Sequence, residues 1–176
     1  MAAQRARTQN DDEYDIDGFG IGVVREEGRW RCVPMPLAAL TSLSEAETEL
    51  RELRSSGATF GLLDVDDEFF VIVRPSPAGT HLLISDAAAA IDYDIAADVL
   101  EMLNVEVPDL DPDELDETDP WEEGELGILA DLGLPEPVMS VILAETDLYP
   151  DEQLQMIAER LGFEREFAAV VDSIQK

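Results

Sequence analysis

The feature of this sequence that most restricts its fold is an acidic run, interrupted by prolines, between two hydrophobic segments. From Asp109 to Glu123, nine of fifteen residues are Asp or Glu, and Pro112 and Pro120 lie among them. Like charges repel and proline disrupts helices and central strands, so such a run is a poor candidate for a packed core. We therefore predict an acidic, proline-containing linker over residues 105–123.

Three further segments follow from this division. The polar residues 1–16 predict a disordered leader, and order is expected to begin near Asp17. Residues 17–104 predict an α+β sheet domain, and residues 124–176 predict a small helical C-terminal region. The sequence leaves open whether these C-terminal helices pack on the sheet domain.

Apolar periodicity within 17–104 predicts the element order β-β-α-β-β-β-α. Phe19, Ile21 and Val23 alternate with smaller residues, as in a strand. The stretch 69–73 is apolar without alternation, which is typical of a central strand covered on both faces. The expected strands after the first are 29–33, 59–65, 68–74 and 80–85, and the expected helices are 44–55 and 87–103. We predict an antiparallel five-stranded sheet with packed helices, followed by the linker and the helical region.

Helix boundary signals are clear in several places. Ser44 and Glu47 have the spacing of a capping box, which predicts that the first helix begins there. Gly133 and Gly162 follow apolar segments, as glycines that end helices do. The C-terminal helices are expected at 125–132, 137–145, 150–161 and 164–174.

The charge balance excludes several classes of partner. The chain has 41 Asp and Glu against 11 Lys and Arg, a net charge of −30. Nucleic-acid affinity comes mainly from cations that neutralise phosphates, so we expect no direct nucleic-acid binding. Anionic membranes are disfavoured for the same reason. No apolar stretch is long enough to cross a bilayer, and the first residues do not resemble a secretory signal, so we expect a cytoplasmic protein.

The sequence offers little material for catalysis. Cys32 is the only cysteine and His81 the only histidine, which excludes a disulfide and a cysteine-based zinc site. Acidic stretches that start at Asp64 and Asp109 lack the glycine and the final glutamate of a calcium loop. We predict no catalytic residues, no metal and no cofactor.

Two groups of residues are candidates for binding a partner. Asp94, Asp98 and Glu101 are spaced to lie on one helical face, which is either an exposed acidic face or a patch that meets a basic partner. Trp121 lies in an acidic run, where a large ring needs a surface to rest on. It either anchors the linker on its own domain or, with its neighbours Glu122 and Glu123, enters a pocket of a partner.

Several stretches resemble a bacterial family called tRNA adenosine deaminase-associated proteins. They are FGLLDVDDEFFVIVRP at 60–75, LLISDAAAAIDYDIAAD at 82–98, DLYPDE at 147–152 and AERLGF at 158–163. The resemblance implies association with the enzyme that converts adenosine to inosine in tRNA. That enzyme class uses a zinc-bound water and a glutamate. This sequence lacks the corresponding ligand pattern, and the resemblance supplies no catalytic residues.

We therefore expect a non-enzymatic accessory protein that docks on a basic partner such as tRNA adenosine deaminase. One alternative is an interaction scaffold, similar to profilin-like or longin-like domains, that forms a homodimer and is unrelated to tRNA. A further alternative is an enzyme that uses paired carboxylates with a divalent ion. That enzyme would need acids that converge in a pocket with raised pKa values.

Overall fold

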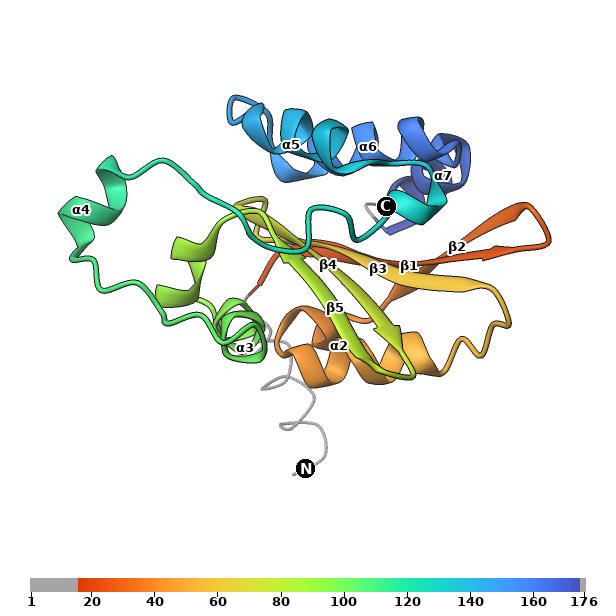
Figure 1. Cartoon of the computed structure of the whole chain (residues 1–176), viewed down its shortest axis with the longest axis horizontal. Coiled ribbons are helices and arrows are strands. Elements are labelled where there is room, and N and C mark those ends of the chain that lie inside the picture. Colours follow the sequence, from red (N-terminus) through yellow and green to blue (C-terminus); the bar gives the residue numbers. More distant parts are fainter. Residues whose placement is uncertain (1–15, 175–176) are drawn as a thin grey trace, which may run out of the picture.

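The computed structural model describes residues 16–174 and has three layers, with a central sheet between two groups of helices (Figure 1). Helices α2 (Leu43–Arg51) and α3 (Asp94–Met102) cover one face. Helices α5 (Glu136–Ala144), α6 (Pro150–Leu161) and α7 (Glu164–Ile174) cover the other. The C-terminal helices therefore pack on the sheet domain. Apart from Ile16, the expected leader lies outside the described residues.

The sheet is antiparallel throughout, with the strand order β2-β1-β3-β4-β5-β6. The strands are β1 (Gly18–Glu26), β2 (Arg29–Met35), β3 (Ala58–Val65), β4 (Phe69–Ser76), β5 (Gly79–Ile84) and β6 (Glu123–Gly124). The α+β class and the antiparallel sheet are confirmed, but the prediction of five strands is wrong. The sixth is β6, where the chain returns from the acidic run and Gly124 pairs with Leu83.

Strands β3 and β4 are buried on both faces. Phe60 and Leu62 of β3 face the C-terminal helices, whereas Leu63 and Val65 belong to the cluster under α2 and α3. The side chains of strand β4 also alternate between the two clusters. The unbroken apolar stretch at 69–73 predicted this burial on both faces. Because side chains alternate along a strand, Asp64 faces the same side as Leu62, toward α6.

Two paired glycines allow α2 to lie close to the sheet. Gly22 of β1 is opposite Gly61 of β3. A Cβ atom would lie 2.9 Å from Leu53 Cδ1 at Gly22 and 3.0 Å from Leu50 Cδ1 at Gly61, so a larger residue at either position would press on these leucine side chains. Gly22 and Gly61 thus have a packing role.

Helix α2 begins earlier than predicted. The Ser42 hydroxyl accepts the N–H of Glu45 at 3.2 Å, so Ser42 is the capping residue and the expected capping box at Ser44 is wrong. An earlier start buries Leu43, which is 3% exposed, at the first helical position. It also lets the Leu43 N–H donate to the Asp98 carboxylate of α3.

The helix expected over 87–103 is interrupted. It consists of a 3-10 helix, η2 (Ala87–Ile91), and α3, separated by Asp92 and Tyr93. Tyr93 takes an extended conformation, and its hydroxyl donates to Asp66 Oδ2 at 2.7 Å. Its ring packs on Phe69, with 5.2 Å between the ring centroids. These contacts compensate for the missing helical turn.

Other short elements lie in the loops. Residues 125–132 form turns that end in a 3-10 helix, η3 (Ala130–Leu132), instead of the expected helix. Arg74 stabilises this loop by donating to the Ile128 carbonyl and to both Asp131 carboxylate oxygens at 2.7–2.8 Å. Another 3-10 helix, η1 (Leu37–Leu40), precedes α2.

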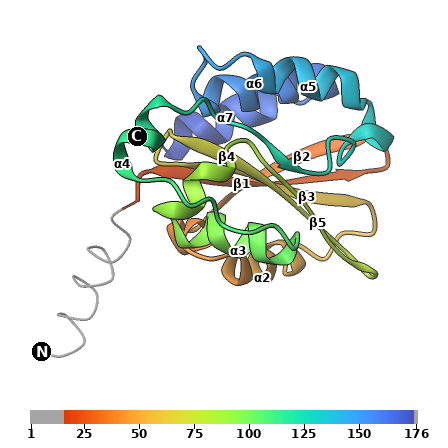
Figure 2. The same cartoon turned by 60° about the vertical axis from the view of Figure 1, so that its left-hand side comes forward.

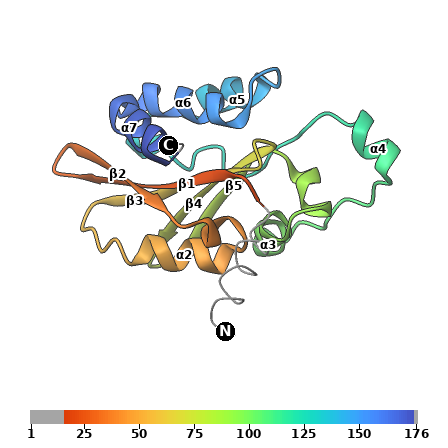
Figure 3. The same cartoon turned by 180° about the vertical axis from the view of Figure 1, so that it is seen from behind.

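The acidic run itself contains a short helix, α4 (Pro112–Glu117), that was not predicted. Asp111 accepts the N–H of Glu114 at 2.8 Å, and Glu114 accepts the N–H of Asp111 at 3.1 Å, a complete capping box. Figure 2 and Figure 3 show α4 beside one end of the sheet, where the chain passes from the α3 side to the α5 side.

An aromatic group joins the C-terminal helices to the sheet. Phe163, between α6 and α7, is fully buried, and its ring centroid lies 4.7 Å from Trp30 of β2. It also meets Phe60 of β3 edge to face at 6.2 Å. These contacts connect residues from both ends of the chain.

Replacing Phe163 with Ala should therefore destabilise the entire protein. Deletion of a fully buried Phe side chain costs about 3–5 kcal/mol, and urea unfolding measures the loss. Val141→Ala on the outer face of α5, where Val141 is 58% exposed, is the control and should change stability by less than about 0.5 kcal/mol. Equal effects of the two substitutions would contradict this account of the packing.

Candidate functional site

The turn between β3 and β4 carries a dense group of acids. Asp66 and Asp67 form its centre, and both have a φ of 56°, which Asp tolerates better than most residues. The Asp66 carboxylate accepts the N–H of Asp17 at 2.7 Å, and the Asp17 carbonyl accepts the N–H of Asp66 at 2.8 Å. The turn thereby fixes the start of the first strand.

Three carboxylates converge beside this turn. Atoms of Asp64, Asp67 and Asp151 all lie within 4.8 Å of one another. Asp64 is 2% exposed at the end of β3, and its Oδ1 accepts the N–H of Asp67 at 2.9 Å. Asp151 comes from the first turn of α6, so the cluster joins the sheet to the C-terminal helices.

Burial and crowding favour a proton in this cluster. Burial, followed by the charge of Asp67, raises the pKa of Asp64 from 3.8 to about 8. Burial and the charge of Asp67 also raise the pKa of Asp151. A protonated Asp64 at neutral pH removes one charge from the cluster. The alternative of a carboxylate-based enzyme requires converging acids of this kind. Protonation of Asp64, which reduces the repulsion between the carboxylates, also allows them to lie close together.

The predicted helical acids have different environments. Asp94 and Glu101 of α3 are exposed, as a patch for a partner would need. Asp98 is half-buried, and its Oδ2 accepts the N–H of Leu43 at 3.1 Å. Asp98 therefore also has a structural role, joining α3 to α2.

Trp121 rests on its own domain. Its side chain is half-buried against the cluster under α2 and α3, and its carbonyl accepts the N–H of Ala87 at 2.8 Å. This is the anchoring alternative of the two that the sequence left open. Glu122 is exposed, and Glu123 pairs with Ile84 as part of β6.

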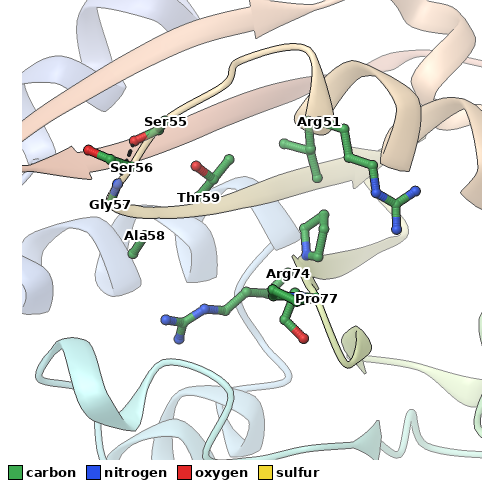
Figure 4. Close-up of a pocket in the computed structure, with 11 residues that line it drawn as sticks. Arg51, Ser55, Ser56, Gly57, Ala58, Thr59, Arg74 and Pro77 are labelled. Atoms are coloured by element: carbon green, nitrogen blue, oxygen red, sulfur yellow. Dashed lines mark hydrogen bonds between the residues drawn. The ribbon is translucent and has the colours of Figure 1, made fainter.

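A groove of about 510 Å³ lies between the end of α2 and strands β3 and β4. Figure 4 shows that Arg51 and Arg74 line it, together with the segment Ser55–Thr59. Arg74 is bound to Asp131, and Arg51 contacts Glu47 at 3.5 Å. Because both cations have acidic partners, this groove is a weak candidate for an anion site.

The single cysteine and the single histidine lie on different strands, Cys32 on β2 and His81 on β5. Burial raises the pKa of the Cys32 thiol to about 12, so the reactive thiolate is scarce at neutral pH. The Nδ1 atom of His81 lies 2.9 Å from Glu125 Oε1 at the surface.

Sequence reasoning missed the cluster of Asp64, Asp67 and Asp151. Its one local signal is Asp64, a carboxylate within the apolar stretch 60–65 of a strand. Nothing in the sequence places Asp151 beside it, because only the packing of α6 on the sheet brings the two together.

The fold and this acidic end define a class of acidic α+β protein with helices on both faces of the sheet. A family model described as Rv3753c-like tRNA adenosine deaminase-associated protein matches residues 18–164. The chain is also similar to Protein Rv3753c of Mycobacterium tuberculosis (strain ATCC 25618 / H37Rv), with 64% identity over 174 residues and 99% of each sequence covered. No solved structure matches significantly.

The chain thus belongs to the tRNA adenosine deaminase-associated family, and the resemblance noted in the sequence is confirmed. Among the helices of residues 16–174, none combines the length and apolar character needed to cross a bilayer.

The raised pKa of Asp64 predicts the direction of a pH effect. The folded state retains a proton that the unfolded state loses above pH 3.8, so this group reduces stability as pH rises toward about 8. Asp64→Asn removes that penalty, and its amide can still accept the Asp67 N–H. We expect the thermal midpoint of the variant, relative to wild type, to rise by several degrees between about pH 5 and about pH 9.

Asp172→Asn, an exposed change on α7, is the matched control and should give a difference that does not vary with pH. A constant difference for Asp64→Asn would contradict the protonated state.

Proposed function

We propose that this protein is a non-enzymatic accessory protein that docks, through its acidic surface, on a basic surface of a tRNA adenosine deaminase. The family description names an association with that enzyme. The charge inventory supports docking on a basic partner. Asp and Glu number 41 against 11 Lys and Arg, so the acidic residues exceed the basic ones by 30.

The residue inventory supports a role outside catalysis. Deaminases of this class hold zinc with a histidine and two cysteines, or with three cysteines, and this chain has one residue of each type. His81 contacts Glu125 at the end of the sheet where β5 begins, whereas Cys32 lies on β2 at the opposite edge. The deaminase itself would supply the chemistry, and this protein would contribute binding and regulation.

The exposed acids of α3 provide the most direct surface for docking. Asp94 and Glu101 are exposed, and Met102 beside them is 48% exposed, so an apolar contact is available next to the two charges. Charge complementarity of this kind mainly accelerates encounter and weakens as salt screens it.

Capture of purified tRNA adenosine deaminase by the immobilised protein tests this function. We expect capture at about 0.1 M salt and release at about 1 M, because the Debye length shrinks from about 10 Å to about 3 Å. Asp94→Asn with Glu101→Gln should weaken capture, and this pair leaves the Asp98 bond to Leu43 intact.

The control pair is Glu159→Gln with Asp172→Asn, two exposed acids on α6 and α7 that remove the same charge from the other helical layer. Failure to capture the deaminase at either salt concentration would refute the association. Capture that is insensitive to salt would refute its electrostatic basis.

Divalent ions distinguish docking from the carboxylate enzyme alternative. A catalytic ion at Asp64, Asp67 and Asp151 would displace the proton and stabilise the folded state by binding to it. The docking account predicts that millimolar Mg²⁺, Mn²⁺ or Ca²⁺ shifts the thermal midpoints of wild type and Asp64→Asn equally. A saturable shift that disappears in Asp64→Asn would favour the enzyme.

A further inference from the structure

A cleft of about 350 Å³ lies between the acidic run and the body of the protein. One wall includes Leu115 and Asp116 of α4, and the opposite wall comes from the start of β4 with the turn before it and from η2 with the residues on either side of it. Figure 1 shows α4 at the outermost point of the chain segment that bridges the two helical layers. The cleft is therefore a junction between the run and the folded body.

Both walls of the cleft are negatively charged. Asp116 of α4 is on one side, and Glu68, Asp86 and Asp92 are on the other. Of the described residues that line the cleft, none is basic, and the three ion pairs found within residues 16–174 lie elsewhere. Like charges on facing walls repel, and a cation between them would turn this repulsion into attraction.

The floor of the cleft is apolar and aromatic. Tyr93 and Ala89 line it from the body, and Leu115 lines it from α4. The Tyr93 ring is fixed by the hydroxyl bond to Asp66 and by packing on Phe69. Leu115 is only half-buried, although it is the one apolar residue of α4.

The run is attached to the body mainly at its ends. The Val105 N–H donates to the Leu100 carbonyl, and the Trp121 carbonyl accepts from Ala87. Between these two bonds, within the described chain, every hydrogen bond of residues 106–120 is made inside the run. Contacts with a ligand in the cleft would therefore add to few existing ones.

We propose that this cleft receives an arginine side chain from a basic segment of the partner protein. The proposal rests on the docking function above and adds a second point of contact to the exposed acids of α3. The guanidinium would lie between Asp116 and Asp92 and donate to carboxylates on both walls. Its aliphatic stem would cover Leu115, and its plane would lie against the Tyr93 ring.

Arginine fits this cleft better than lysine for three reasons. Its planar group donates in two directions, it stacks on aromatic rings, and it loses less hydration than an ammonium group. A cation over a tyrosine ring is attracted by the negative face of the ring, and the attraction strengthens as the site is desolvated.

The test measures binding of a labelled peptide with three arginines separated by Gly-Ser pairs to the full chain, by fluorescence anisotropy at about 0.1 M salt. Asp92→Asn with Asp116→Asn changes one acid on each wall and should weaken binding roughly tenfold, or about 1.4 kcal/mol. The control pair Glu159→Gln with Asp172→Asn removes the same charge elsewhere and should weaken binding less than about twofold.

Leu115→Ser keeps the charge constant and should still weaken binding by about threefold or more, because the stem of the ligand loses its apolar contact. The same peptide with lysines should bind less tightly than the arginine peptide. Equal losses for the two charge pairs, or wild-type affinity for Leu115→Ser, would overturn the proposal.

Capture of the deaminase separates failure of the cleft from failure of the proposed function. If wild type and Asp92→Asn/Asp116→Asn capture the enzyme equally, docking stands and the cleft is refuted as its receptor. If wild type captures no enzyme, the proposed function fails, and the peptide measurement still decides whether the cleft binds arginine.

Discussion

Burial of β3 and β4 on both faces is the constraint on which the rest of this structure depends. A chain with a net charge of −30 resists compaction through self-repulsion, so apolar contacts must compensate. Neither group of helices alone covers the sheet, and Phe163 inserts against Trp30 and Phe60 to close one face. The C-terminal helices are therefore integral to the fold, and the acidic run is the crossing between the faces.

The fold could be predicted from sequence where a local pattern determines the structure. The uninterrupted apolar stretch of β4 indicates two-sided burial, and Pro150 and Gly162 mark the limits of α6. Strand β6 has only two residues and no apolar pattern, because its role is to pair with the edge of β5. The interruption before α3 depends on a bond from Tyr93 to Asp66, which is distant in sequence.

The candidate site was harder to predict from sequence, because it too depends on contacts between residues that are distant in the chain. Helical spacing predicts one face for the acids of α3, but the contact of Asp98 with Leu43 arises only when α2 and α3 pack together. The cluster of Asp64 and Asp151 and the cleft beside α4 both join segments that lie far apart in the chain. Each depends on tertiary structure, and a carboxylate looks the same in sequence whether it is buried or exposed.

The acids of this structure fall into two groups, those crowded inside the protein and those that line a cleft. The two groups differ in how the repulsion between carboxylates can be reduced. Where carboxylates crowd inside the protein, as at Asp64, a proton from water neutralises one of them, because burial favours the uncharged form. Where they face one another across a cleft, as Asp116 and Asp92 do, none of the described lining residues is basic, so nothing in the lining offsets the repulsion. Neutralisation there has to come from outside the chain, which has too few cations of its own.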